Sequence, residues 1–380
     1  MNNSDNFNFK CIIFKENCYN IIMKSNEYCI CYDDINNHHD LFDIIKGKSD
    51  IIDIREKCIF RGLDNDTYRL EPSSLRNDGK ELNKFISNNE MIPILAHSEK
   101  LDDIPIIIEK DVKIPRDLIN GIGDYMNIIQ KWKEFTVLMK FINASDKNGL
   151  KINVDESIRR IIDFDSFKLF FNHWPDERLF GNIALAQHYG TPTRFLDWSY
   201  DYRVSMYFAT KDIINNKPGC DENDEKTDGV LWAFNHKLFN NLSSLEYDEK
   251  FKLQFYRAEY NSNPNLNAQK GLFAFFINNP KDEYKEEFHQ IIINQFKKND
   301  EMGDEIEKGT LFERVHPLKT SDIPGDEKIF YKFIIPHDMK QDVLKELIKE
   351  NCFTNQLFPS YNGVSESIKH KVILDELNNK

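Results

Sequence analysis

Residues 184–199 read ALAQHYGTPTRFLDWS, and this stretch marks where a helix ends and a buried strand begins. Apolar residues at helical spacing lead into Gly190, which suits the position just past a helix C-terminus, and Pro192 prevents the helix from continuing. Residues 193–198 then have the apolar character of a strand, but they include Arg194 and Asp197. Because burying a charge costs several kcal/mol unless it is paired, these side chains either neutralise other charges or form a site.

Each polar residue of this stretch also has a purely structural interpretation. Arg194 and Asp197 would pair with other charges and hold the sheet together, and for them both interpretations stay open. His188, at the helix end, suits a capping or core histidine that the helix dipole favours. Trp198 is expected to be a packing anchor, and Gln187 would hydrogen-bond a loop backbone.

Three further elements place polar residues at the ends of apolar segments. Residues 58–62 read CIFRG, a short strand that ends in an arginine and a glycine. Arg61 is placed to clamp a phosphate or carboxylate, and Gly62 would let a ligand approach the backbone. Residues 267–276, NAQKGLFAFF, are a polar turn before an apolar strand, and residues 357–363, LFPSYNG, follow a helix.

In this order the four elements resemble those of the FRG-domain family, which is named for a Phe-Arg-Gly tripeptide. Here that tripeptide is residues 60–62, and the most specific part of the resemblance runs from Gln187 to Trp198. The resemblance covers residues 51–368. It implies a family that recurs in bacterial and phage proteins, some of them linked to antiviral defence, so a toxin or anti-phage effector is one expectation.

The order of elements is also similar to that of ADP-ribosyltransferases, which implies NAD as the substrate. By this resemblance Arg61 stands at the strand arginine that anchors NAD, and Ser199 stands at a serine before a helix. Tyr207 lies on that helix beside the nicotinamide pocket, and Gln269 takes the place of a glutamate that fixes the ribose. The physical logic is that Arg61 neutralises the pyrophosphate while an acceptor holds the ribose hydroxyl as positive charge develops on the sugar.

Gln269 departs from this pattern because an amide accepts hydrogen bonds but carries no charge. Asp197 and Glu71 are the nearest carboxylates by motif that would supply the missing charge. The predicted catalytic residues are Arg61, Asp197, Ser199 and Gln269. The predicted ligand-binding residues are Arg61, Gly62, Gln187, His188, Arg194 and Tyr207.

Three classes of function stay open. The first is an NAD-dependent ADP-ribosyltransferase or NAD glycohydrolase. The second is a non-catalytic sensor in which Arg61, Arg194 and Gln187 bind a nucleotide-like anion. The third is a hydrolase or nuclease that uses His188 with Asp197, which the acidic charge and the lack of a second carboxylate motif disfavour. Because polar strand ends gather sites, all three predict that residues 58–62, 187–198 and 269 converge on one cleft.

Composition limits the partners and the compartment. A formal net charge of −13 over 380 residues disfavours a general nucleic-acid or anionic-membrane binder. Seven cysteines, an odd number without a C-x-x-C pair, favour reduced thiols in a cytoplasmic protein. The polar, Asn-rich N-terminus lacks a signal-peptide pattern, and no apolar run reaches the length of a membrane span. The histidines show no metal-ligand spacing, so no metal is expected.

The remaining pattern predicts an α+β protein. Residues 9–33 have the pattern of short strands, residues 230–234 and 329–335 that of buried strands, and residues 338–351 that of an amphipathic helix. Residues 104–108 fit a strand or part of a helical region. We expect a mixed, mainly antiparallel sheet resembling an ADP-ribosyltransferase fold, with a helical insertion between the first strand and the central motif.

The predicted domains are an N-terminal β-rich extension over residues 1–50 and an FRG domain over residues 51–375. Within the FRG domain, residues 80–180 form the mainly helical insertion, residues 193–336 the sheet core, and residues 338–375 a C-terminal helix and tail.

Overall fold

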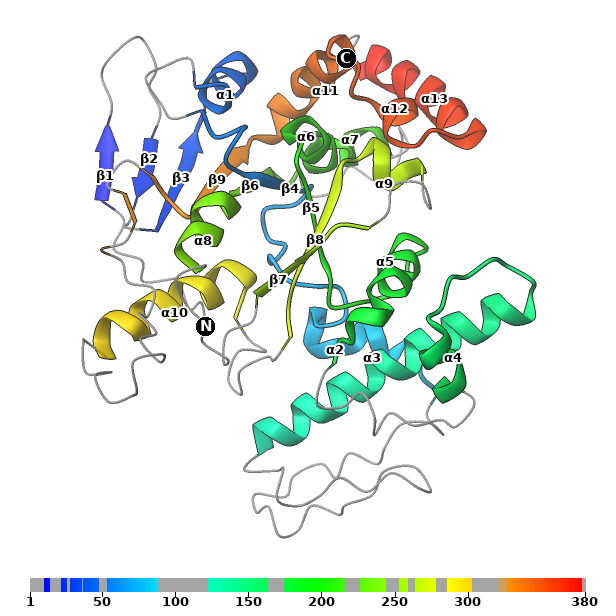
Figure 1. The fold of residues 1–380 in the computed structure, drawn as a ribbon. Coiled ribbons are helices and arrows are strands. Elements are labelled where there is room, and N and C mark those ends of the chain that lie inside the picture. Colours follow the sequence, from blue (N-terminus) through cyan, green and yellow to red (C-terminus); the bar gives the residue numbers. More distant parts are fainter. Residues whose placement is uncertain are drawn as a thin grey trace.

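The described part of the chain forms a single sheet with helices against both faces (Figure 1). The computed structural model describes residues 10–13, 22–25, 28–35, 37–47, 53–87, 122–162, 174–215, 226–243, 253–258, 264–277, 286–302, 321, 323–324 and 327–377.

The sheet is mixed and mainly antiparallel. Its strands are β1 (Lys10–Ile13), β2 (Ile22–Ser25), β3 (Cys29–Asp34), β4 (Ile59–Leu63), β5 (Leu196–Ser199), β6 (Gly229–Phe234), β7 (Leu253–Tyr256), β8 (Gly271–Phe276) and β9 (Phe330–Ile335). They lie in the order β1-β2-β3-β9-β6-β4-β5-β8-β7. Neighbours are antiparallel except β3 and β9, which are parallel.

Helices surround this sheet and form the insertion between β4 and β5. They are α1 (His38–Ile45), α2 (Arg76–Asn83), α3 (Ile122–Lys147), α4 (Glu156–Ile162), α5 (Phe180–His188), α6 (Tyr202–Thr210), α7 (Asp212–Asn215), α8 (His236–Ser243), α9 (Pro264–Ala268), α10 (Phe288–Met302), α11 (Lys340–Lys349), α12 (Thr354–Leu357) and α13 (Tyr361–Leu377), with 3-10 turns at Glu177–Leu179 and His337–Met339. Among the described residues, none of these helices combines the length and apolarity that a bilayer crossing requires.

Strand β6 is buried on both faces because each face meets a separate layer of helices. Leu231 and Ala233 pack in a core with α1, α6 and α11. Val230, Trp232 and Phe234 pack in a core with α8 and α10 on the other face. Each fully buried side chain of this size contributes roughly 1.5–3 kcal/mol. This two-sided burial explains why residues 230–234 read as a continuous apolar run rather than an alternating one.

A third core joins the helical insertion to the β5–β8 side of the sheet (Figure 1). Helices α3, α4 and α5 contribute apolar side chains to it, and the sheet side contributes Phe195, Phe273 and Phe275. The rings of Phe195 and Phe275 are stacked with centroids 4.4 Å apart. The insertion is therefore packed onto the segment that leads into β5.

Helix α6 lies directly against β4 and β6 because two glycines face it. A Cβ on Gly62 would lie 1.8 Å from the backbone oxygen of Ser205, and one on Gly229 would lie 2.2 Å from that of Ala209. No real side chain fits at such distances. The backbone of α6 therefore excludes a side chain at Gly62. Gly62 also lines the cavity between β4, β5 and β8, and the approach of a ligand to its backbone stays a prediction.

The predicted α+β class with a mixed, mainly antiparallel sheet is confirmed, and helices α2 to α5 lie between β4 and β5. The resemblance to an ADP-ribosyltransferase fold stays a prediction. Strand β5 starts at Leu196 rather than at residue 193, because the backbone of Thr193 is bound elsewhere. Its N–H donates to the hydroxyl of Ser73, and its carbonyl accepts from the N–H of Ser74. The predicted helix end is confirmed, since α5 stops at His188 and Gly190 has a left-handed φ of 86°.

The N-terminal strands extend the same sheet, because β3 pairs with β9. The predicted boundary near residue 50 therefore does not separate two sheets, and the domain division itself stays a prediction. The segment 104–108 lies outside the described residues.

We predict that Gly62→Ala destabilises the protein by roughly 3 kcal/mol, at the upper end of the usual range for overpacking. The atoms that block the new methyl group belong to the helix backbone and cannot rotate away. Gly181→Ala is the matched control, since its new Cβ would come no closer than 3.5 Å to the hydroxyl of Tyr256. Urea unfolding of both variants measures the difference, and equal stabilities would contradict the close packing of α6.

Candidate functional site

A cavity of about 310 Å³ lies where β4, β5 and β8 meet α6 and the end of α5. Its size is at the lower end of small-molecule sites. Its polar lining is Arg61, Gln187, His188, Asp197, Ser199, Ser205 and Gln269. Its apolar lining includes Val204, Phe208, Leu266, Leu272, Phe273 and Phe358. The predicted convergence of residues from the three sequence elements is confirmed.

Arg61 reaches from β4 to β5 and leaves part of its guanidinium unused. One terminal nitrogen donates to the backbone oxygen of Asp197 at 2.6 Å and lies 3.4 Å from the Asp197 carboxylate. Burial lowers the pKa of Arg61, which Asp197 partly opposes and Arg76 reinforces. The Nε of Arg61 is buried without a hydrogen-bond partner among the described residues. A buried donor left unsatisfied is costly, and a bound anion would satisfy it.

Asp197 is held on two sides and remains open on the third. The amide nitrogen of Gln187 donates to Oδ1 at 2.6 Å, and Arg61 lies beside Oδ2. Its side chain is nevertheless 58 % exposed. The carboxylate is therefore oriented by the protein and still accessible from the cavity.

His188 is a neutral hydrogen-bonding group. Its Nε2 lies 3.2 Å from the amide nitrogen of Asn265, so it acts as the acceptor. Burial lowers the pKa of His188, and the charge of Asp197 opposes this only in part. The helix dipole, which would favour a protonated ring, does not dominate. Within the described residues His188 bonds to Asn265 rather than to Asp197, which leaves a His–Asp hydrolytic pair without support.

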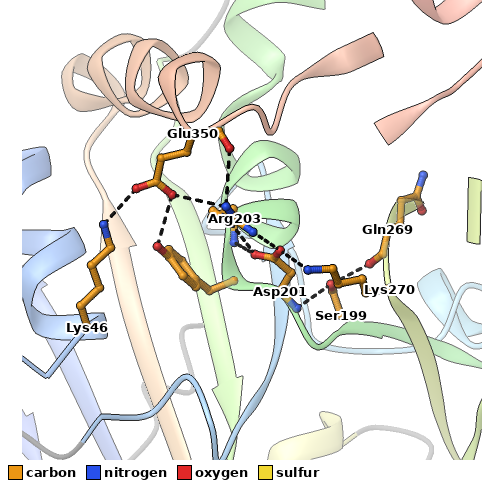
Figure 2. Close-up of polar contacts among 8 residues, drawn as sticks. Lys46, Ser199, Asp201, Arg203, Gln269, Lys270 and Glu350 are labelled. Carbon is orange, nitrogen blue, oxygen red and sulfur yellow. Dashed lines mark hydrogen bonds and ion pairs between the residues drawn. The ribbon is translucent and has the colours of Figure 1, made fainter. Parts of the chain in front are cut away.

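Ser199 and Gln269 meet through the backbone (Figure 2). The hydroxyl of Ser199 donates to the carbonyl of Gln269 at 2.7 Å and accepts from the N–H of Asp201 at 3.0 Å. Ser199 therefore fixes the turn that opens β8. The side chain of Gln269 extends away from Ser199, and its nitrogen donates to the carbonyl of Leu357 at 3.3 Å. Its oxygen accepts nothing from the described residues and is available to a ligand.

A network of charges behind this turn was not identified from the sequence (Figure 2). Asp201 caps α6 and accepts from Arg203 at 2.6 Å and from Lys270 at 2.9 Å. Burial alone would raise the pKa of Asp201, but these bonds outweigh burial and lower it to about 2. Arg203 also lies 3.9 Å from Glu350, which pairs with Lys46 at 2.9 Å. The only sequence signal was an aspartate directly before a helix, typical of an N-cap.

Arg194 does not line the cavity, although the sequence placed it among the ligand-binding residues. Its Nε donates to Glu134 of α3 at 2.6 Å, and both side chains are 3 % exposed. Glu134 also accepts from the hydroxyl of Ser74 at 2.7 Å and from the indole of Trp174 at 2.8 Å. Of the two interpretations kept open for Arg194, the structural ion pair agrees with this geometry.

Tyr207 and Glu71 also lie outside the cavity lining. Tyr207 is 2 % exposed and its hydroxyl lies 2.9 Å from that of Thr354, so it faces the core. The next residue, Phe208, faces the cavity instead. Trp198 packs against Phe234 with ring centroids 5.8 Å apart, as expected of an anchor.

Among the described residues that line the cavity, Asp197 is the sole carboxylate. Nowhere in the described part of the chain do three or more His, Cys, Asp or Glu side chains group as a metal site would require.

A family model described as FRG domain matches residues 130–217. The chain carries an FRG domain. The matched range contains Gln187, Asp197 and Ser199, whereas Arg61 and Gln269 lie outside it. The cavity is thus built from the matched part of the FRG domain together with strands on either side of it in the sequence. Searches of curated proteins and of solved structures give no match.

The Glu134 geometry predicts that Glu134→Gln costs roughly 3–5 kcal/mol, because it leaves the Arg194 guanidinium buried without its counter-charge. The control is Glu156→Gln, whose partner Arg160 and own side chain are 77 % and 73 % exposed, so its loss should stay below about 1 kcal/mol. Chemical denaturation measures both. A loss at Glu134 as small as that of the control would contradict the structural role of this ion pair.

The Arg61 geometry predicts that Arg61→Lys weakens the binding of inorganic pyrophosphate at least about tenfold, because lysine keeps the charge but lacks the planar fork of donors. The melting temperature should change little. Calorimetric titration of wild type, Arg61→Lys and the exposed control Arg159→Lys makes the comparison. If Arg61→Lys instead lowers the melting temperature sharply and leaves the affinity intact, Arg61 is a structural ion-pair member.

Proposed function

We propose that this FRG-domain protein uses NAD as a substrate, as an ADP-ribosyltransferase or an NAD glycohydrolase. The observation that carries the proposal is the meeting of Arg61, Asp197 and Gln269 at one cavity, from β4, from β5 and from the turn before β8. Arg61 has an unused buried donor, which a pyrophosphate requires. Asp197 has an exposed carboxylate, which stabilises a developing sugar cation, and Gln269 has an unused amide oxygen for a ribose hydroxyl.

The residues divide into three roles. Arg61 offers its free Nε to the pyrophosphate. Phe208 and Phe358 supply the aromatic wall for the nicotinamide ring. Gln269 accepts the ribose hydroxyl, and Asp197 supplies the negative charge that Gln269 lacks.

The proposed reaction breaks the bond between the ribose C1′ and the nicotinamide nitrogen. The bonding electrons leave with nicotinamide, which becomes neutral, and positive charge develops on the sugar. Asp197 stabilises that charge across the cavity. Water or an acceptor nucleophile then bonds to C1′ and releases one proton. Loss of NAD from the cell is the route by which such an enzyme would act as a toxin or anti-phage effector.

A non-catalytic sensor of nucleotide-like anions is the second candidate. It is favoured by the same pairing that holds Asp197, since Arg61 and Gln187 already occupy both carboxylate oxygens. A carboxylate neutralised in this way is less able to stabilise a cation. In this function Arg61 binds the anion, and no bond in the ligand breaks.

Nicotinamide release from NAD distinguishes the two candidates. We predict that Asp197→Asn lowers the rate by a hundredfold or more, because electrostatic groups of this kind contribute roughly 2.7–4 kcal/mol to catalysis. Gln269→Glu should hold or raise the rate by restoring a charge at the ribose. Asp146→Asn is the control, since Asp146 also pairs with an arginine, Arg159, at 2.8 Å but does not line the cavity.

The assay has three outcomes that contradict the proposed enzyme or the roles given to its residues. If NAD raises the melting temperature of the wild type but no nicotinamide is released, the protein is the sensor. Release that neither variant changes, with NAD affinity intact, contradicts the chemistry assigned to Asp197 and Gln269. If Asp197→Asn unfolds the protein, Asp197 is a structural partner of Arg61 and Gln187.

A further inference from the structure

The hydroxyl of Thr193 lies outside the cavity lining but contacts a residue that lines it. Its oxygen accepts from the backbone N–H of Phe195 at 3.2 Å, and its hydrogen is donated to the side-chain oxygen of Gln187. Thr193 is 6 % exposed, so its side chain is largely shielded from solvent. It therefore has a defined donor and a defined acceptor.

These bonds form a chain in which every donor points toward Asp197. Phe195 donates to Thr193, Thr193 to Gln187, and Gln187 to the carboxylate at 2.6 Å. An ionised carboxylate only accepts hydrogen bonds. The Gln187 amide must therefore present its nitrogen to Asp197 and its oxygen to Thr193, the arrangement that the Thr193 hydroxyl satisfies.

The backbone of Thr193 is itself held by the segment that begins the helical insertion. The hydroxyl of Ser73 accepts from the N–H of Thr193 at 3.0 Å and lies 3.2 Å from its carbonyl. The N–H of Ser74 donates to the same carbonyl at 3.0 Å. Ser74 and Arg194 both bond to Glu134 of α3. The position of Thr193 thus depends on the insertion.

We propose that Thr193, clamped by Ser73 and Ser74, is a positioning residue that sets the Gln187 amide and through it the Asp197 carboxylate. The inference deepens the proposed function, because the activity it would control is NAD turnover. The positioning can be tested without that activity. Thr193 itself would contact no ligand and would act on the reaction only through Gln187 and Asp197.

The test uses Thr193→Val, which keeps the shape and removes the hydroxyl. Thr193→Ser restores the hydroxyl, and Thr210→Val is a control that deletes another fully buried threonine hydroxyl, bonded to the Met206 carbonyl at 2.8 Å. The direct readout is the side-chain amide signal of Gln187 in protein labelled with ¹⁵N-glutamine, identified by its absence in Gln187→Asn. In wild type this signal should follow the protonation of Asp197 as pH is varied.

In Thr193→Val the Gln187 signal should no longer follow the titration of Asp197, and Thr193→Ser should restore the dependence. Nicotinamide release should fall about tenfold in Thr193→Val, the scale of one lost neutral hydrogen bond, and recover in Thr193→Ser. Thr210→Val should change neither readout. If Thr193→Val does not fold, Thr193→Ala removes the same hydroxyl and provides the same test.

An unchanged Gln187 titration in folded Thr193→Val or Thr193→Ala overturns the positioning role. A wild type that releases no nicotinamide overturns the proposed enzyme instead. The titration then still decides whether Thr193 positions Asp197, because it requires no turnover.

Discussion

The binding of residues 193 and 194 to the helical insertion is the constraint on which the cavity depends. Ser73 and Ser74 use the backbone of Thr193, and Glu134 takes the guanidinium of Arg194. With these groups occupied, the segment cannot pair as a strand until Leu196. Asp197, the second residue of β5, then lines the cavity. The insertion is therefore part of the site and does not merely interrupt the sheet.

Two charged residues close together in the sequence have opposite environments as a result. Arg194 is 3 % exposed and meets a carboxylate that several other donors also satisfy. Asp197 is 58 % exposed and meets an arginine whose Nε stays unsatisfied. Arg194 also keeps one buried nitrogen, Nη2, without a hydrogen-bond partner among the described residues, so the two pairs differ in the exposure of the carboxylate. An ion pair buried on both sides supports structure, whereas an exposed carboxylate beside an unsatisfied donor is suited to a ligand. The central motif thus combines a buried ion pair at Arg194 with an exposed carboxylate at Asp197, for which a role toward a ligand is our proposal.

Much of this arrangement was predictable from local chemistry. Gly190 and Pro192 marked the end of α5, and the continuous apolar run at 230–234 marked a strand buried on both faces. Arg61 and Gln269 could be placed at the cavity because polar residues at strand ends collect there. Arg194 and Tyr207 could not be placed correctly, because their partners Glu134 and Thr354 lie 60 and 147 residues away. The packing of Gly62 against α6 could not be predicted for the same reason, since only the folded structure brings that helix against it. Strand β7 has only partly buried residues and gave no signal.

The most direct test of the account is a crystal structure of the protein with a non-hydrolysable carba analogue of NAD. The account predicts that the analogue lies in the cavity, with its pyrophosphate accepting from the Nε of Arg61 and a ribose hydroxyl donating to the side-chain oxygen of Gln269. Asp197 should face C1′ while keeping its bond from Gln187. An analogue bound elsewhere, or an empty cavity at saturating concentration, would contradict the account.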